Sequence, residues 1–424
     1  MTLSRRSFIR YLGMGVAAAA VTGRSSSARA ATARVVVVGG GYGGATAAKY
    51  LRMWAPDLHV TLVERDATFV SCPLSNRVLA GLCRLDDLTR SYERLHAHWG
   101  VALIHDEAIA IDPDKRHVRL ASGAALPYDA LILSPGLDLM LDAVPGLKAA
   151  DASGIVLHAW KAGPQTMALR KQLEAMPDGG VYAIALPKAP YRCPPGPYER
   201  ACQVAWYFKT QKPKSKVLIL DANEKVQSKE ALFTRVWEQM YAGIVDYRPN
   251  STLIEVDAGT KTAKLEFEDV RADVLNVVPP QRAGQIAAGA GLITANDKWC
   301  EVDFLTFEST VKKDIYVLGD AVLAAPAMPK SGHMANQHGK ACAAAIIARL
   351  HDQPVDPAPM LSNTCYSFVS DKDAIHIASV HQYDVAQKTF LPVAGSAGVS
   401  SAPSAREGEY AQAWGKNIWA DMLD

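Results

Sequence analysis

The sequence of 424 residues lacks several features that mark particular classes of protein. It contains no run of lysine and arginine and no basic stripe interleaved with aromatic residues, so nothing in it indicates nucleic-acid binding. Neither a Cys-x-x-Cys-His motif nor a Cys-x-x-Cys pair occurs, which excludes a haem attached to this chain and argues against a metal site. After the first thirty residues no segment approaches eighteen uninterrupted apolar residues, and we therefore expect no membrane span.

Acidic residues are absent from residues 1–30, which contain five arginines. Ser4 to Arg10 resembles the twin-arginine export consensus, an apolar stretch too short to span a bilayer follows, and Ala28-Arg29-Ala30 resembles a cleavage site. Removing residues 1–30 as a signal peptide changes the formal net charge from +2 to −3, so the mature chain is not notably basic. Because this export route carries folded cargo, we expect a periplasmic protein that takes up its cofactor before it leaves the cytoplasm.

A glycine-rich motif comes directly after this segment. The apolar residues 35–38 predict a buried strand, the glycines at 39, 41 and 44 follow, and a helix continues beyond them. Gly39 permits a tight turn, Gly41 lets the backbone approach a pyrophosphate, and Gly44 lets the helix pack closely on the strand. The helix N-terminus adds free N–H donors for the anion, so the motif predicts a dinucleotide site.

Three later segments support a flavin dinucleotide. Glu64 ends the next predicted strand and can accept hydrogen bonds from a ribose diol. Gly136 and the pair Gly319-Asp320 each close a buried strand, and these segments resemble the recurring signatures of flavoproteins with two dinucleotide-binding domains. That resemblance implies that Asp320 hydrogen-bonds the ribitol of FAD. An alanine-rich helix expected from about residue 336 to 350 would direct its positive N-terminal end at the flavin.

Between these two halves lies a second α/β unit, with strands expected at 180–186 and 216–220. The loop after its first strand holds prolines at 187, 190, 194, 195 and 197 in place of a glycine fingerprint. Proline has no N–H donor and stiffens the backbone, so this loop cannot hold a pyrophosphate as glycines do. We therefore expect a Rossmann-like scaffold whose nicotinamide site is lost.

The expected fold class is α/β, with two Rossmann-like dinucleotide-binding domains of the disulfide-reductase type and a C-terminal α+β interface domain. The expected ranges are 1–30 for the signal peptide, 34–149 and 266–345 for the FAD-binding domain, 150–265 for the second Rossmann-like domain, and 346–424 for the interface domain. In the final helix Tyr410, Trp414, Ile418 and Met422 recur every four residues, a pattern typical of a core or subunit-contact stripe.

Seven cysteines, an odd number, leave at least one outside any disulfide. Cys202 and Cys342 lie in helical patterns among small apolar residues, and Cys83 and Cys300 have no reactive context, so we interpret these four as buried, inert thiols. The remaining cysteines are Cys72, Cys193 and Cys365.

From about residue 34 onward, the sequence resembles the flavoprotein subunit of flavocytochrome c sulfide dehydrogenase. The segments that carry the resemblance are 43–50, 72–76, 158–163, 192–200, 279–284, 328–332 and 363–367. The resemblance implies a thioether from Cys72 to the 8α-methyl of FAD, a redox-active Cys193–Cys365 disulfide beside the isoalloxazine, and Glu199 and Trp414 on the substrate side. It also places Lys330 among the cofactor-binding residues. Pro73 departs from the family, in which an aromatic residue follows the attachment cysteine.

The implied activity is oxidation of hydrosulfide to sulfur or polysulfide. Hydrosulfide attacks one sulfur of a disulfide and expels a thiolate, and Glu199 handles protons if an apolar pocket raises its pKa. A structural disulfide, and a Glu199 that is only a cap or an ion pair with Arg200, remain alternatives. Since this chain carries no haem, a separate cytochrome c subunit would accept the electrons in a heterodimer. Two other functions stay open: a sulfide:quinone oxidoreductase, and an exported flavin protein that acts as a redox sensor or interaction module without turnover.

Overall fold

The computed structural model describes residues 33–424. Its first unit contains a seven-stranded sheet in the order β21-β22-β23-β9-β1-β2-β5. These strands are β1 (Arg34–Val38), β2 (His59–Val63), β5 (Ala102–Ile104), β9 (Ala130–Leu133), β21 (Val302–Asp303), β22 (Glu308–Ser309) and β23 (Ile315–Val317). β1 pairs in parallel with β2 and β9, and β23 pairs in parallel with β9, so the carboxyl ends of these strands meet at one edge. This is the dinucleotide-binding sheet that the sequence predicts.

Two helices, α3 (Tyr42–Trp54) and α11 (Gly332–Leu350), pack tightly against one another beside this sheet. Small residues make the approach possible: a Cβ added at Gly339 of α11 would lie 2.5 Å from the carbonyl oxygen of Gly43 in α3. α11 begins four residues before the expected start at 336, because Ser331 caps it by accepting a hydrogen bond from Met334 N at 3.0 Å.

An antiparallel meander also belongs to the first unit. It consists of β6 (Ala108–Asp112), β7 (His117–Leu120) and β8 (Ala125–Pro127). Shorter elements connect the main ones: β3 (Thr68–Val70), α4 (Asn76–Leu79), β4 (Thr89–Ser91), α5 (Glu93–Ala97), β10 (Leu137–Leu139), α6 (Leu147–Ala152), β18 (Gln281–Ala283), α10 (Gln285–Gly289), β19 (Ile293–Ala295) and β20 (Trp299–Cys300).

The second unit holds a four-stranded parallel sheet in the order β13-β12-β11-β17. Its elements are α7 (Pro164–Ala175), β11 (Val181–Leu186), α8 (Gly196–Gln211), β12 (Lys216–Asp221), α9 (Glu230–Met240), β13 (Val245–Arg248), β14 (Leu253–Asp257), β15 (Thr262–Leu265), β16 (Asp269–Arg271) and β17 (Val274–Val277). The boundary expected between residues 265 and 266 differs from this pairing, because β17 follows that boundary and yet completes the second sheet beside β11.

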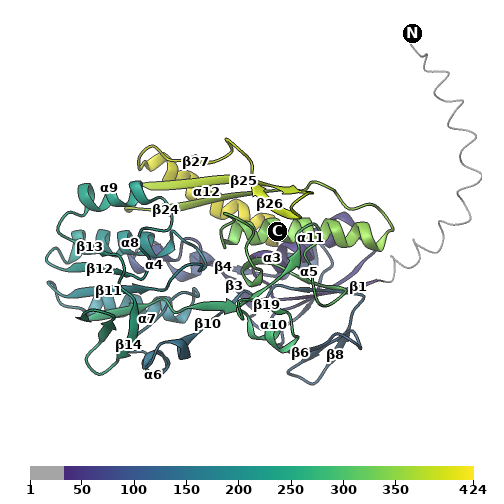
Figure 1. The fold of residues 1–424 in the computed structure, drawn as a ribbon, viewed down its shortest axis with the longest axis horizontal. Coiled ribbons are helices and arrows are strands. Elements are labelled where there is room, and N and C mark those ends of the chain that lie inside the picture. The colour runs from purple at the N-terminus through teal and green to yellow at the C-terminus, as the bar shows by residue number, and fades with distance from the viewer. Residues whose placement is uncertain (1–32) are drawn as a thin grey trace, which may run out of the picture.

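The C-terminal unit lies across both of the others (Figure 1). It comprises β24 (Met360–Phe368), β25 (Ala374–Asp384), β26 (Thr389–Pro392), β27 (Gly398–Val399) and α12 (Ala405–Leu423). β24 contacts α8 of the second unit, and α12 contacts α3 of the first. This layer therefore brings C-terminal residues to the junction of all three units.

Only the C-terminal half of the apolar stripe expected along α12 is buried in the core. Ile418 and Met422 are 5% and 0% exposed, whereas Tyr410 is 52% exposed. A spacing of four residues turns about 40° further than a full helical turn at each step, so the stripe rotates out of the core toward its N-terminal end. Within residues 33–424 no helix is both long and apolar enough to cross a membrane.

Candidate active site at the junction of three units

A cavity of about 240 Å³ lies where the three units meet. The first unit contributes its glycine loop and the residues after β9 and β23, the second contributes the start of α8, and the third contributes β24 and α12. The lining includes Gly41, Cys72, Gly136, Arg192, Cys193, Glu199, Asp320, His333, Cys365 and Trp414. Ligands of open α/β sheets bind outside the carboxyl ends of the strands, which is where this cavity lies.

The three glycines of the first loop have different surroundings. Gly39 has φ +98, and a Cβ there would lie 2.3 Å from Ser134 O. A Cβ at Gly44 would lie 1.9 Å from Gly39 O, so this position requires glycine for close packing. At Gly41, by contrast, an added Cβ would meet no atom within 4 Å. Gly41 therefore borders open space at the N-terminus of α3, as the pyrophosphate assignment requires.

Glu64 follows the last residue of β2 and is hydrogen-bonded to the backbone of the glycine loop. Its Oε2 accepts a hydrogen bond from Gly40 N at 2.7 Å, and its Oε1 accepts one from Asp66 N at 3.0 Å. Glu64 is not among the residues that line the cavity. The ribose contact expected of it stays a prediction.

The residues after β9 and β23 fit a flavin nucleotide. Gly136 has φ +65 and faces open space, so the backbone there is accessible to a ligand. Asp320 has a buried Oδ1 without a hydrogen-bond partner, and its Oδ2 lies 3.9 Å from Arg192 Nη1. Gly319 lines the cavity with it. A ribitol hydroxyl would satisfy the unpartnered carboxylate oxygen, which is the role that the sequence resemblance gives to Asp320.

The N-terminus of α11 points at this cavity through Ser331, Gly332 and His333. His333 Nδ1 accepts a hydrogen bond from Thr364 N at 2.9 Å. His338, expected as a surface residue, is buried, and its Nδ1 accepts from Gly319 N at 3.3 Å. Burial lowers the pKa of His338 to about 3, so this imidazole is neutral and holds the Gly319-Asp320 turn.

Lys330 does not line this cavity. Its Nζ donates to Asp320 O at 2.9 Å and to Val322 O at 2.5 Å, and it lies 3.7 Å from the centre of the Trp299 ring. Burial lowers the pKa of Lys330 to about 8. The ammonium fixes the turn around Asp320, and a direct contact with the cofactor stays a prediction.

Cys72 lies in the loop between β3 and α4 and lines the cavity. Its Sγ accepts a hydrogen bond from Ala162 N at 3.5 Å, and its carbonyl accepts one from Ser75 Oγ at 2.6 Å. The sulfur is thus held toward the cavity from both sides of the loop. Pro73 is accommodated without removing Cys72 from the lining.

Cys193 and Cys365 line the same cavity although they come from different units. Cys193 has φ +58, and its N donates to Lys330 O at 2.8 Å. A Cβ at Gly196 would lie 3.0 Å from the Cys193 sulfur, so the start of α8 approaches that sulfur closely. All seven cysteines fall within residues 33–424 and all are thiols, so the structure shows the pair unbonded and the disulfide stays a prediction for the oxidised protein.

Both thiols are partly buried and lie among other ionisable groups. Burial raises the pKa of Cys193, and the neighbouring Cys365 and Glu199 raise it further. Burial also raises the pKa of Cys365, while the Lys229 ammonium opposes that rise. Of the other cysteines, Cys202, Cys300 and Cys342 are buried as expected, whereas Cys83 is only partly buried.

Glu199 lies one turn into α8 and is 7% exposed. Its carboxylate accepts hydrogen bonds from Asn76 Nδ2 at 3.0 Å and from Phe368 N at 2.9 Å. Burial raises its pKa, which suits a group that transfers protons near neutral pH. Its neighbour Arg200 instead donates to Asn76 Oδ1 and to the carbonyl of Ala159, so the ion pair considered from the sequence is not formed among the described residues.

Trp414 reaches the cavity from α12, next to His333 and Tyr366. The Trp414 ring lies 5.9 Å from the His333 ring and 6.4 Å from the Tyr366 ring, centre to centre. The last helix therefore contributes an aromatic wall to the site.

Tyrosines occupy the position where a second nucleotide would contact the second unit. Tyr198 OH donates to Asp221 Oδ2 at 2.7 Å, and Tyr247 OH donates to the same atom at 3.2 Å. Tyr191 and Tyr198 are both buried. An acid at the end of the second strand of a Rossmann unit ordinarily serves a ribose, but here Asp221 is already bonded by the protein.

Sequence reasoning missed three groups at the site: Asn76, Arg192 and Lys229. Asn76 and Arg192 stand inside segments that carried the family resemblance, which was the available signal. Lys229 stands in a polar stretch with no motif, and its side chain is buried because it bonds to β24, a strand far along the chain. Nothing in the local sequence distinguishes it from a solvated lysine.

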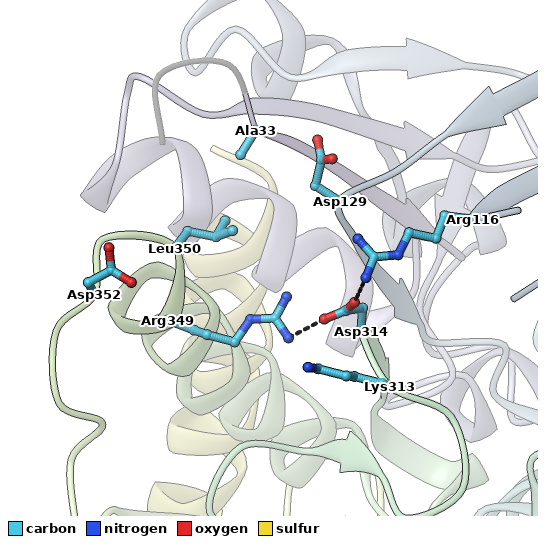
Figure 2. A pocket seen from close by; sticks show the side chains of 8 residues that line it. All are labelled: Ala33, Arg116, Asp129, Lys313, Asp314, Arg349, Leu350 and Asp352. Atoms are coloured by element: carbon cyan, nitrogen blue, oxygen red, sulfur yellow. Dashed lines mark hydrogen bonds and ion pairs between the residues drawn. The ribbon is translucent and has the colours of Figure 1, made fainter. Parts of the chain in front are cut away.

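A second cavity, of about 320 Å³, lies at the opposite edge of the first sheet, near the amino ends of β1, β9 and β23. Figure 2 shows Arg116 and Arg349 on either side of Asp314, each forming an ion pair with it. Its lining contains three basic and three acidic residues. The charges balance, so we interpret it as a structural ion-pair cluster. Among residues 33–424 no group of three or more His, Cys, Asp or Glu side chains is arranged to hold a metal ion.

Comparison with protein families gives three matches that together cover most of the described chain. Residues 33–165 match the pyridine nucleotide-disulphide oxidoreductase family, residues 166–279 match the central region of the sulfide dehydrogenase (flavocytochrome c) flavoprotein chain, and residues 357–423 match the flavin-binding region of flavocytochrome c sulphide dehydrogenase.

Individual relatives agree with these matches. The sulfide dehydrogenase (flavocytochrome c) flavoprotein chain of Chlorobaculum thiosulfatiphilum is 64% identical over 37 residues, which are 9% of this chain and 77% of that relative. The sulfide-quinone reductase of Aquifex aeolicus is 25% identical over 347 residues, covering 76% of this chain and 78% of the relative. The crystal structure of the sulfide:quinone oxidoreductase from Aquifex aeolicus superposes with a TM-score of 0.76 at 20% identity, covering 92% of this chain and 91% of that one, which establishes the shared fold.

Proposed function

Because the chain belongs to the family of flavocytochrome c sulfide dehydrogenase flavoprotein chains, we propose that it oxidises hydrosulfide through a Cys193–Cys365 disulfide and FAD and passes electrons to a cytochrome c subunit. The observation that carries the proposal is the shared cavity. Cys193, Cys365 and Glu199, from two units, line the same space as the glycine cradle and Asp320 of the first unit.

The reactive steps on the protein are thiol chemistry. Hydrosulfide attacks one sulfur of the oxidised pair, a new S–S bond forms there, and the Cys193–Cys365 bond breaks with its electron pair remaining on the other sulfur as a thiolate. Glu199, whose burial raises its pKa, exchanges the proton of the incoming sulfur species. FAD, when bound, supplies a two-electron acceptor that can release electrons singly to a haem.

The residues that line the cavity fit FAD, because different residues would hold different parts of the cofactor. Gly41 and the N-terminus of α3 would hold the pyrophosphate, and Asp320 would hold the ribitol. Cys72 lies on the same cavity wall, in support of a thioether at this residue. We further propose twin-arginine export to the periplasm, for which the motif at Arg5 and Arg6 lies outside the described residues.

A quinone is the alternative acceptor, because the sequence comparison and the structural comparison both match a sulfide:quinone enzyme of Aquifex aeolicus. The family matches at 166–279 and 357–423 favour the cytochrome instead. Stopped-flow assays with sulfide and either cytochrome c or a soluble quinone separate these functions. We expect cytochrome c reduction and a haem-containing partner on purification. Reduction of the quinone alone would support the alternative, and flavin reduction without either acceptor would support a redox sensor.

Cys193→Ser tests the disulfide. We expect this variant to keep its yellow flavin and to lose bleaching by sulfide under anaerobic conditions, because no disulfide remains for hydrosulfide to open. Cys83→Ser is the matched control, since Cys83 is a partly buried thiol outside the cavity lining. Bleaching of Cys193→Ser at the rate of the control would remove the disulfide from the mechanism.

A further inference from the structure

Lys229 is a buried ammonium that is hydrogen-bonded to the backbone of Cys365. It immediately precedes α9, has φ +56 and is 7% exposed. Its Nζ donates hydrogen bonds to Cys365 O at 3.0 Å and to Ser367 Oγ at 2.8 Å. Both acceptors belong to β24, so the ammonium is fixed against the strand that carries Cys365.

The charged groups that face Lys229 come from four different segments. In order of strength they are Cys365 on β24, Glu199 on α8, Cys193 in the loop before α8, and Glu407 on α12. Glu407 is itself hydrogen-bonded by Ser400 Oγ at 2.6 Å and lies 3.1 Å from His376 Nδ1. Glu199 keeps its own hydrogen bonds to Asn76 and Phe368. Among the described residues Lys229 forms no ion pair with a carboxylate within 4.0 Å, and the Cys365 thiol is the ionisable group that acts most strongly on it.

We propose that Lys229 is the positioning residue that holds negative charge on the Cys365 sulfur once the disulfide opens. The proposal rests on the function given above and deepens it by adding a residue to the thiol chemistry. A buried thiolate without a cation is costly, and Arg192, the other cation acting on this pair, is directed to Trp160 O and Asp320.

Neighbouring side chains also affect the pKa of the Cys365 thiol. Asn363 contacts the Cys365 sulfur at 3.7 Å through Nδ2, and Ser331 Oγ donates to Asn363 Oδ1 at 2.7 Å. Burial and Glu199 raise the pKa of the Cys365 thiol, whereas Lys229, Asn363 and Ser331 lower it. At Cys193, burial, Cys365 and Glu199 raise the thiol pKa and Lys229 and Arg192 lower it, so the two thiols titrate as a coupled pair that shares the Lys229 charge.

The test is the pH profile of alkylation at Cys365. The holoenzyme is reduced anaerobically with a phosphine, freed of excess reductant and exposed to iodoacetamide over a pH series, and labelling of the Cys365 peptide is followed by mass spectrometry. Only the thiolate reacts. Lys229→Met should move the labelling midpoint upward by about one pH unit, so that labelling below the midpoint is about tenfold slower. Lys229→Gln should do the same, and Lys229→Arg should retain the original profile.

Lys225→Met is the matched control, because Lys225 is an exposed lysine on the same segment and its loss should leave the profile unchanged. Flavin absorbance and the thermal midpoint show that each variant is folded. A Lys229→Met profile that coincides with that of the unsubstituted enzyme would overturn the proposal, as would equal shifts in Lys229→Met and Lys229→Arg. The readout needs neither sulfide nor an acceptor, so failure of the proposed function, seen as absence of sulfide bleaching, is a separate result.

Discussion

At the scale of single residues, the site depends on ionisable groups that are kept away from water. Glu199, Lys229 and both cysteines are each surrounded by the others' charges. In such a cluster the protonation of one group depends on the others, so their titrations are coupled. The reactivity of a given sulfur is therefore a property of the cluster and not of that residue alone.

Glu199→Gln removes the proton carrier and leaves one oxygen, which can keep the hydrogen bond from either Asn76 Nδ2 or Phe368 N, because these donors bond Oε2 and Oε1 of Glu199. We expect sulfide-dependent turnover to fall about 10²-fold, with FAD content unchanged. Since burial raises the pKa of Glu199, its proton is lost at a higher pH than that of an ordinary carboxyl. The limb of the pH–rate profile due to this group should disappear in the variant. A group with no role in proton transfer could be replaced with little loss of turnover. Turnover of Glu199→Gln within about twofold of that of the original enzyme would therefore contradict the assignment.

At the scale of elements, the turn between β1 and α3 contains one glycine that close packing requires, Gly44, and one that borders the cavity, Gly41. Gly44→Ala places a methyl group 1.9 Å from Gly39 O, a backbone atom that cannot yield, so we expect a loss of roughly 1–3 kcal/mol in the free energy of unfolding or failure to fold. Gly41→Ala meets no protein atom within 4 Å, and residue 41 has an ordinary φ of −72.

Gly41→Ala should therefore fold normally and bind FAD poorly. The measurement pairs thermal unfolding with the visible flavin absorbance per polypeptide for both variants. Normal flavin content in Gly41→Ala would show that the cofactor does not approach this turn. A stable Gly44→Ala protein would show that the turn relaxes more than its backbone contacts indicate.

At the scale of the whole molecule, three units line one candidate site, and the second unit keeps a Rossmann-like sheet whose Asp221 is already bonded by tyrosines. Tyr198 and Tyr247 donate to Asp221 at the place where a ribose would bind, and Tyr191 OH lies 3.4 Å from Tyr198 OH. The remaining sheet serves another purpose, because it places Cys193 and Glu199 at the start of α8.

We expect NADH and NADPH to leave the flavin spectrum unchanged under anaerobic conditions that allow bleaching by sulfide. The physical reason is that the proline-rich loop offers few N–H donors and that Asp221 is already bonded by tyrosines. Anaerobic absorbance titration measures this directly, with sulfide as the positive control on the same sample. Bleaching by either nucleotide at micromolar concentration would show that the second unit retains a working site.

Much of the fold follows from the sequence, because its signals are local. The strand at 35–38, the glycines after it, and the Gly319-Asp320 turn each depend on residues within a few positions of one another. Turn geometry and strand burial are set at that range, so they can be identified without coordinates. The domain boundary near residue 265 was misplaced because β17 joins the second sheet through pairing with β11, and that pairing has no local signature.

The sequence by itself determined the α/β class, the dinucleotide motif and, by resemblance, the cysteines and Glu199. Only the tertiary structure decided that Lys229 is hydrogen-bonded to the backbone of Cys365, a partner 136 residues further along the chain, and that Asp320 retains an unpartnered oxygen in the shared cavity. The reason is physical: a charge or a thiol acquires its chemistry from burial and from neighbours that packing brings together, and neither is encoded in the spacing of residues along one segment.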